Sequence, residues 1–281
     1  MARPRAHLGH GIGLRPQHFR DFLEGLPEVD WIEAISENFM VRGGRPLSVL
    51  EKVRRDVPVV LHGVSLSIGA CDPLDPVYLR ELATLVHRIE PALVSDHLSW
   101  GRHAGTYVHD LWPLPYTDEA VAHVVARVEQ VQEALGRTIL LENVSSYVSY
   151  RESTLTEWEF LGQIANRAGC GILLDLNNVY VSSRNHGFDP HSYIAGLPGS
   201  RVQQLHLAGH TDMGRYVLDS HDAPVSDAVW SLYEYTLHHL GRVPTLIEWD
   251  DAVPPLDVVL AESRKAEALE ATVLDRVEVA S

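Results

Sequence analysis

The chain has 281 residues, with 23 Lys and Arg against 38 Asp and Glu, so its formal net charge is −15. Its length supports a large α/β domain, and its hydrophobic fraction of 45% argues against disorder. The acidic balance argues against a nucleic acid partner, and no apolar run reaches the roughly 18 residues of a membrane span. Two cysteines are too few for a disulfide scaffold and no secretory signal is evident, so we expect a cytoplasmic protein.

Short apolar runs rich in β-branched residues alternate with longer amphipathic segments along the chain. The runs that predict strands are 8–14, 29–35, 57–66, 92–98, 138–144, 171–179, 202–207 and 243–249. The clearest predicted helices are 76–90, 118–135, 156–168, 226–240 and 256–269. Eight units of about 35 residues are typical of a (β/α)₈ TIM barrel.

We therefore predict a single TIM-barrel domain over residues 1–281, with the barrel at about 7–270 and a short C-terminal tail. A doubly wound open sheet is the alternative, but it would normally have a glycine-rich loop that leads from its first strand into a helix. Here Gly9, Gly11 and Gly13 fall at the start of a predicted strand and inside it, with no helix directly behind them.

Histidines and acids gather at the carboxyl ends of the predicted strands, which meet at one face of a barrel. These residues are His62, Asp96, His97, Glu142, Asp175, Asn178, His206, His210 and Glu248, and Asp219 and His221 follow in a loop. Glu142, Asp175 and Glu248 lie within apolar runs, where an unpaired carboxylate is costly. The chain has only two lysines, both in helical segments, and Arg15 is the one arginine near these strand ends. We therefore expect metal ions to neutralise these acids.

Histidine and carboxylate ligands together suit Fe, Mn or Zn. The candidates outnumber the six positions of one octahedral ion, so two or three ions are the more economical interpretation, with Glu142 as a bridge. Each residue alone has an ordinary explanation: a lone histidine is often structural, Asp175 suits a helix cap, and 219–222 suits a solvated loop. The metal interpretation depends on the convergence of six strand ends.

The segments 62–69, 96–100, 141–144, 174–180, 206–210 and 247–250 resemble the multinuclear non-heme iron-dependent oxidative enzymes. This family includes the catalytic subunit that forms oxazolone and thioamide groups in methanobactin. The resemblance covers about residues 11–251 and implies a TIM barrel with two or three iron ions. It assigns one iron to His62, His97 and Glu142, a second to Glu142, Asp175, His206 and Glu248, and a third to Asn178, Asp219 and His221.

The resemblance also implies an O₂-dependent oxidation of cysteine in a ribosomally made precursor peptide, delivered by a separately encoded leader-binding helper protein. Asp96 and His210 are then the candidate catalytic residues, expected beside the metals or facing the substrate, and His186 is a candidate substrate contact. Cys71 follows the third strand without an assigned role.

Two other classes of function compete with this interpretation. One is a divalent-metal isomerase or endonuclease that binds Mn, Co or Zn through Glu142, Asp175, His206 and Glu248. An isomerase usually places a lysine near its sugar, and an endonuclease needs a basic face; this chain offers neither. The other is a non-catalytic scaffold or metal-sensing module.

Overall fold

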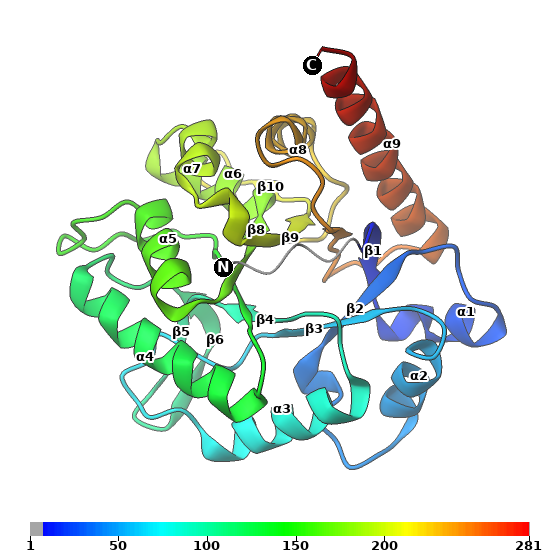
Figure 1. The fold of residues 1–281 in the computed structure, drawn as a ribbon, viewed down its shortest axis with the longest axis horizontal. Helices are drawn as coiled ribbons and strands as arrows, with labels where there is room; N and C mark the ends of the chain where they lie inside the picture. Colours follow the sequence, from blue (N-terminus) through cyan, green and yellow to red (C-terminus); the bar gives the residue numbers. More distant parts are fainter. Residues whose placement is uncertain (1–7, 281) are drawn as a thin grey trace.

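The structure is a computed structural model that describes residues 8–280, without the side chains of His109 and residues 277–280. Residue 7, where the barrel was expected to begin, lies outside the described residues. Eight parallel strands form a closed barrel in the order β1-β12-β9-β8-β7-β4-β3-β2 (Figure 1). They are β1 (His10–Gly13), β2 (Trp31–Ile35), β3 (Val59–Gly63), β4 (Val94–His97), β7 (Leu140–Glu142), β8 (Gly171–Asp175), β9 (Val202–Leu207) and β12 (Thr245–Ile247). The predicted barrel is confirmed.

Helices surround the strands on the outside of the barrel (Figure 1). They are α1 (Phe19–Glu24), α2 (Arg45–Val53), α3 (Pro76–Ile89), α4 (Asp118–Leu135), α5 (Glu157–Ala168), α6 (Leu176–His186), α7 (Pro190–Gly196), α8 (Asp227–Leu240) and α9 (Leu256–Ala280). Short 3-10 turns occur at Pro16–His18, Ser36–Asn38 and Gly199–Arg201. No helix among the described residues is both long enough and apolar enough to span a membrane.

Capping residues explain where two of the long helices begin and end. The Thr117 side chain accepts from the backbone N–H of Ala120 at the start of α4, and Gly136 ends this helix with a φ of 63°. Thr156 and Glu159 form a reciprocal capping box at the start of α5. Side-chain oxygens satisfy the free N–H groups of a first turn, and glycine adopts the left-handed conformation without a Cβ clash.

The structure corrects two boundaries and adds two hairpins. The strand expected over 171–179 ends at Asp175, whose carboxylate accepts from the N–H of Asn178 at 2.6 Å and so begins α6. The last helix does not end near residue 269 but continues to Ala280, because residues 270–280 contain no Gly or Pro. Two hairpins were not predicted: β5 (Trp100–His103) with β6 (Thr106–Trp112), and β10 (Thr211–Asp212) with β11 (Val217–Leu218).

Apolar side chains fill the barrel and the layer between strands and helices. The large buried cluster draws on all eight barrel strands and on helices α1 to α9. A smaller cluster of Trp31, Val60 and Leu246 comes from β2, β3 and β12. Within this apolar frame, the buried polar groups concentrate at the carboxyl ends of the strands.

Candidate metal centre

Parallel pairing brings the candidate ligands on the strands together. In the register of the barrel, His97 lies opposite Glu142, and Asp175 lies opposite His206. His62 is the penultimate residue of β3, and Glu248 follows β12 directly. These six side chains are at most 9% exposed. Charged groups this deep need a partner of opposite charge.

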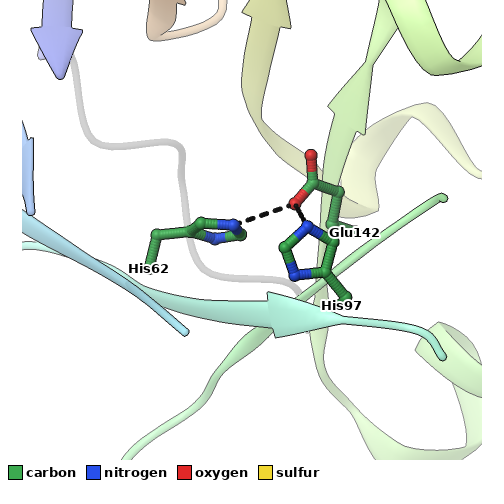
Figure 2. Close-up of side chains that lie close together, drawn as sticks. All are labelled: His62, His97 and Glu142. Atoms are coloured by element: carbon green, nitrogen blue, oxygen red, sulfur yellow. Dashed lines mark ion pairs between the residues drawn. The ribbon is translucent and has the colours of Figure 1, made fainter. Parts of the chain in front are cut away.

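The first group consists of His62, His97 and Glu142. Both imidazole Nε2 atoms lie 3.2 Å from Glu142 Oε2 (Figure 2). Figure 2 shows the two rings approaching the same carboxylate oxygen from different strands. That oxygen is buried and accepts no hydrogen bond.

The hydrogen bonds of the two Nδ1 atoms indicate that a cation is required between the Nε2 atoms and Glu142 Oε2. His97 Nδ1 lies 3.1 Å from the carbonyl oxygen of Gly63, which can only accept, so Nδ1 carries the proton. Burial lowers the pKa of His97, which favours the neutral ring with a lone pair on the Nε2 that faces Glu142. His62 Nδ1 is held by Ser95 Oγ at 2.8 Å. A lone pair facing a carboxylate oxygen is repulsive unless a cation lies between them.

The second group shares Glu142 with the first and adds Asp175, His206 and Glu248. His206 Nδ1 lies 3.4 Å from Glu142 Oε1, 4.0 Å from Asp175 Oδ2 and 3.0 Å from Glu248 Oε2. Asp175 Oδ2 is another buried oxygen without a hydrogen bond. The two oxygens of Glu142 therefore face different groups, as a bridging carboxylate requires.

Electrostatics keep Glu142 and Glu248 ionised. Burial raises the pKa of Glu142, but the neighbouring histidines 97, 62 and 206 outweigh it and lower the net value. Burial likewise opposes ionisation of Glu248, and His206 and His221 hold its pKa well below the usual range. Asp175 differs: burial, reinforced by Glu142, raises its pKa well above normal. Without a cation, this cluster holds more acid than its histidines balance.

Glu33 is a member of this region that the sequence reasoning missed. It lies on β2 and its Oε2 is 3.1 Å from His206 Nε2 and 2.6 Å from the side-chain nitrogen of Gln204. A carboxylate there favours the proton on Nε2 and orients Nδ1 of His206 toward Glu142 and Glu248. The sequence did contain an indication of Glu33, because it is an acid inside the apolar run WIEAI, and the same pattern identified Glu142.

A third group lies at the rim and combines His221 and Glu248 with Asp250. Asp250 was not among the expected ligands. Asp219, which was expected, lies 2.7 Å from His221 Nε2 through its Oδ1. Burial lowers the pKa of His221, but Asp219 and Glu248 more than offset it and raise the net value well above normal. Arg15 also reaches this rim, where it pairs with Asp250 and lies 3.9 Å from Glu248 Oε1.

Members of all three groups line one cavity of about 370 Å³, which we call the metal cavity. The candidate ligands that line it are His62, His97, Asn178, Asp219, His221 and Glu248. Asn178 donates to the carbonyl of Asn143 at 3.0 Å, and its buried Oδ1 has no hydrogen-bond partner. Of the third expected set, only His221 belongs to a compact group, together with Glu248 and Asp250, and Asn178 and Asp219 line the same cavity outside that group.

Asp96, His210 and His186 lie outside the three groups. Asp96 is buried, accepts from the N–H of His97, and lies 3.4 Å from the Tyr78 hydroxyl on α3. His210 is half-buried and its Nδ1 lies 2.8 Å from Asn177 Oδ1. His186, on α6, pairs with Ser146 and lines a different cavity.

The two cysteines are separate from the metal cavity. Cys71 is exposed and lines another cavity, of about 480 Å³, beside Trp100 and His123. Cys170 is buried before β8, and burial raises its pKa to about 12.

Comparisons with known proteins identify relatives over nearly the whole chain. Residues 9–271 match the family described as RiPP precursor modification enzyme MbnB/TglH/ChrH. A UPF0276 protein of Anaeromyxobacter sp. is 65% identical, over 98% of this chain and 97% of its own length. UPF0276 proteins of Acaryochloris marina and Caulobacter vibrioides are 49% and 51% identical, over 95% and 92% of this chain and 96% and 93% of their own lengths.

Solved structures with a similar fold share little sequence. An L-ribulose 3-epimerase has a TM-score of 0.63 at 15% identity, covering 96% of this chain and 97% of its own. A D-tagatose 3-epimerase-like protein has a TM-score of 0.61 at 14% identity, covering 96% and 98%. At this identity the likeness concerns the barrel and carries no information on substrate.

Proposed function

The chain belongs to the MbnB/TglH/ChrH family of RiPP precursor modification enzymes, and from this premise we propose that it is a multinuclear iron enzyme. It uses O₂ to modify cysteine residues of a ribosomally synthesised precursor peptide. The observation that carries the proposal is the position of Glu142, whose two oxygens face two different histidine-containing groups.

The donor set fits iron. Four imidazoles and several carboxylates offer nitrogen and oxygen ligands, which suit non-heme iron. The buried, unpaired oxygens of Glu142 and Asp175, and the neutral Nε2 of His97, are positions that a cation would satisfy. When bound, two or three iron ions would supply the capacity to exchange electrons with O₂ and with a sulfur ligand.

The protein's own residues would hold and orient these ions. His62, His97 and Glu142 would bind one ion, and Glu142 with Asp175, His206 and Glu248 a second; Asn178, Asp219 and His221 would serve a third, with Asp250 in reach of it. Ser95, Gly63 and Glu33 would fix the ring orientations through the opposite nitrogens. The rim groups sit where the cavity meets solvent, so a bound peptide would approach past them.

The substrate would bring the thiolate. Neither Cys71 nor Cys170 lines the metal cavity, so a soft sulfur ligand would have to arrive with the peptide. His210, whose Nδ1 lies 2.8 Å from Asn177 Oδ1, would contact that peptide. Asp96, which lies beside Tyr78 of α3, would act by ordering the backbone at His97. We expect a separately encoded helper to bind the leader segment, and a cytoplasmic setting.

Metal analysis and peptide mass spectrometry test this proposal. After anaerobic purification we expect two to three Fe per chain, and with a Cys-containing precursor peptide, helper and O₂ an oxidative change in peptide mass. A Cys→Ser peptide should not react. The Cys71→Ala enzyme is the internal control and should stay active.

The same experiment distinguishes the competing classes. Zn or Mn alone, or equal turnover of the Cys→Ser peptide, or turnover without oxygen, would contradict the proposal and favour a divalent-metal isomerase. A chain without bound metal would favour a scaffold.

A further inference from the structure

The loop of residues 143–156, between β7 and α5, separates two cavities on the same face of the barrel. Its Ser145 and Tyr147 line the metal cavity. Its Ser146, Val148 and Tyr150 line a second cavity, also of about 370 Å³, which we call the Glu157 cavity. A peptide bound at the metal cavity therefore lies next to a second recess.

The Glu157 cavity combines one buried carboxylate with aromatic walls. Glu157 is 9% exposed, and its Oε1 accepts from the Tyr193 hydroxyl at 3.0 Å. The Tyr116 hydroxyl also hydrogen-bonds to this carboxylate. The aromatic residues that line the cavity are Tyr116, Tyr150, Trp158 and Phe188, and its lining, all within the described residues, includes no Lys or Arg.

The ionisation of Glu157 depends on the charge of the group that occupies the Glu157 cavity. Burial raises its pKa to about 7, against the lowering effect of the hydrogen bonds from Tyr193 and Tyr116. Burial also raises the pKa values of both tyrosines, so they remain protonated donors. Tyr150 and His186 are the other titratable groups at the cavity. A cation placed here favours the ionised carboxylate and also meets the faces of aromatic rings.

We infer that the Glu157 cavity binds a basic side chain of the peptide substrate, through its ammonium or guanidinium group. This inference rests on the proposed function, because the peptide supplies the side chain. The alkyl part of Lys or Arg would pack on the aromatic wall formed by Trp158 and Phe188, whose ring centroids lie 5.8 Å apart. The charged end would pair with the Glu157 carboxylate. His186, held by Ser146 Oγ at 2.8 Å, stands at the rim of this cavity and not at the metal cavity.

Ligand-observed NMR on the full chain as purified tests the cavity without peptide turnover. The probes are N-acetyl-lysine amide and its uncharged counterpart N-acetyl-norleucine amide, followed by saturation-transfer difference signals. We expect saturable binding of the lysine probe at least fivefold tighter than that of the norleucine probe. The lysine probe should bind more tightly at pH 8 than at pH 6, because the carboxylate ionises between them.

The matched variants are Glu157→Gln and Glu152→Gln, which remove one negative charge inside the cavity and one at an exposed position of the same loop. Glu157→Gln should reduce the affinity for the lysine probe at least fivefold and remove its pH dependence, and Glu152→Gln should change neither. The pH dependence of the wild-type chain serves as the test if Glu157→Gln does not fold.

Three results would overturn the inference: equal binding of both probes, undiminished binding by a folded Glu157→Gln chain, or tighter binding of free putrescine than of the lysine probe. All three are independent of iron and O₂, so they are distinguishable from failure of the proposed function. With an active peptide, replacing its basic residue by norleucine should raise KM and leave kcat unchanged.

Discussion

Glu142 and Glu157 are buried carboxylates on the same face of the barrel, and they differ in what surrounds them. Glu142 ends a strand among three histidines, which lower its pKa despite burial. Glu157 begins a helix among tyrosine hydroxyls. Their hydrogen bonds lower its pKa less than burial raises it, so the pKa is about 7. Burial is common to both, so the neighbours decide the charge. Neighbouring histidines keep a buried carboxylate ionised, which suits a permanently bound cation. Neighbouring tyrosines leave a carboxyl group that ionises when a cation binds beside it.

The strongest test of the strand-held site is Glu142→Gln. A neutral amide bridges two cations poorly, so we expect the variant to lose its iron and all activity while it stays folded. Metal analysis measures the iron, and circular dichroism measures the fold. Glu129→Gln, an exposed change on α4, is the matched control. An unchanged iron-to-protein ratio would refute the bridging role.

Glu33→Gln should have the next largest effect on metal. The carboxylate fixes the proton on His206 Nε2, and its loss removes that orientation without removing a ligand. Outer partners of this kind typically contribute about 10- to 100-fold in metal affinity. Competition with a chelator would measure the change. Affinity equal to that of the wild-type chain would mean that Gln204 alone orients the ring.

His221→Ala tests whether the loop residue His221 contributes less to iron binding than the ligands on the strands. We expect a partial loss of iron, because His221 contacts Glu248 and Asp219 but lies on a loop outside the group of His62 and His97. Iron per chain, compared with that of Glu142→Gln, measures the difference. Complete loss would place His221 in the core cluster.

Glu157 should have the smallest effect on metal, and its effect is visible in the pH dependence of stability. Its folded pKa of about 7 lies above the ordinary value of 4.5, so the folded chain binds the extra proton between these values. Stability linked to this group is therefore present below about pH 4.5 and is lost as pH rises through 7, by up to about 3 kcal/mol. Thermal unfolding of Glu157→Gln from pH 5 to pH 8 should show a flatter profile than the wild type. Parallel profiles would mean that Glu157 titrates normally.

Much of the strand-held site could be predicted from the sequence. An acid such as Glu142 within an apolar run can be recognised locally, and a barrel brings all strand ends to one face, so His62 and His97 follow from topology alone. The grouping of His62 with His97 and Glu142 needs no knowledge of loops.

The remainder depends on long-range contacts. Asp250 joins His221 because a loop with a left-handed His221 (φ 47°) folds back onto β12, and no local pattern encodes that approach. The Glu157 cavity likewise depends on distant segments, since its aromatic residues come from α5, from the loop before it, from the segment before α4 and from the turn between α6 and α7. The strand over 171–179 was overextended because the apolar residues of early α6 resemble a buried strand; the cap by Asp175 decides the boundary.

The closure of the barrel has a consequence for biosynthesis. β12, which precedes Glu248, pairs with β1 at the other end of the chain, and α9 packs against β1. The nascent chain thus presents His62, His97 and Glu142 before the strand that completes the barrel has left the ribosome. Since domains fold as units and distant pairing forms late, the full ligand set assembles only when translation is almost complete. A chain interrupted before residue 245 would lack the closing strand and the Glu248 ligand together.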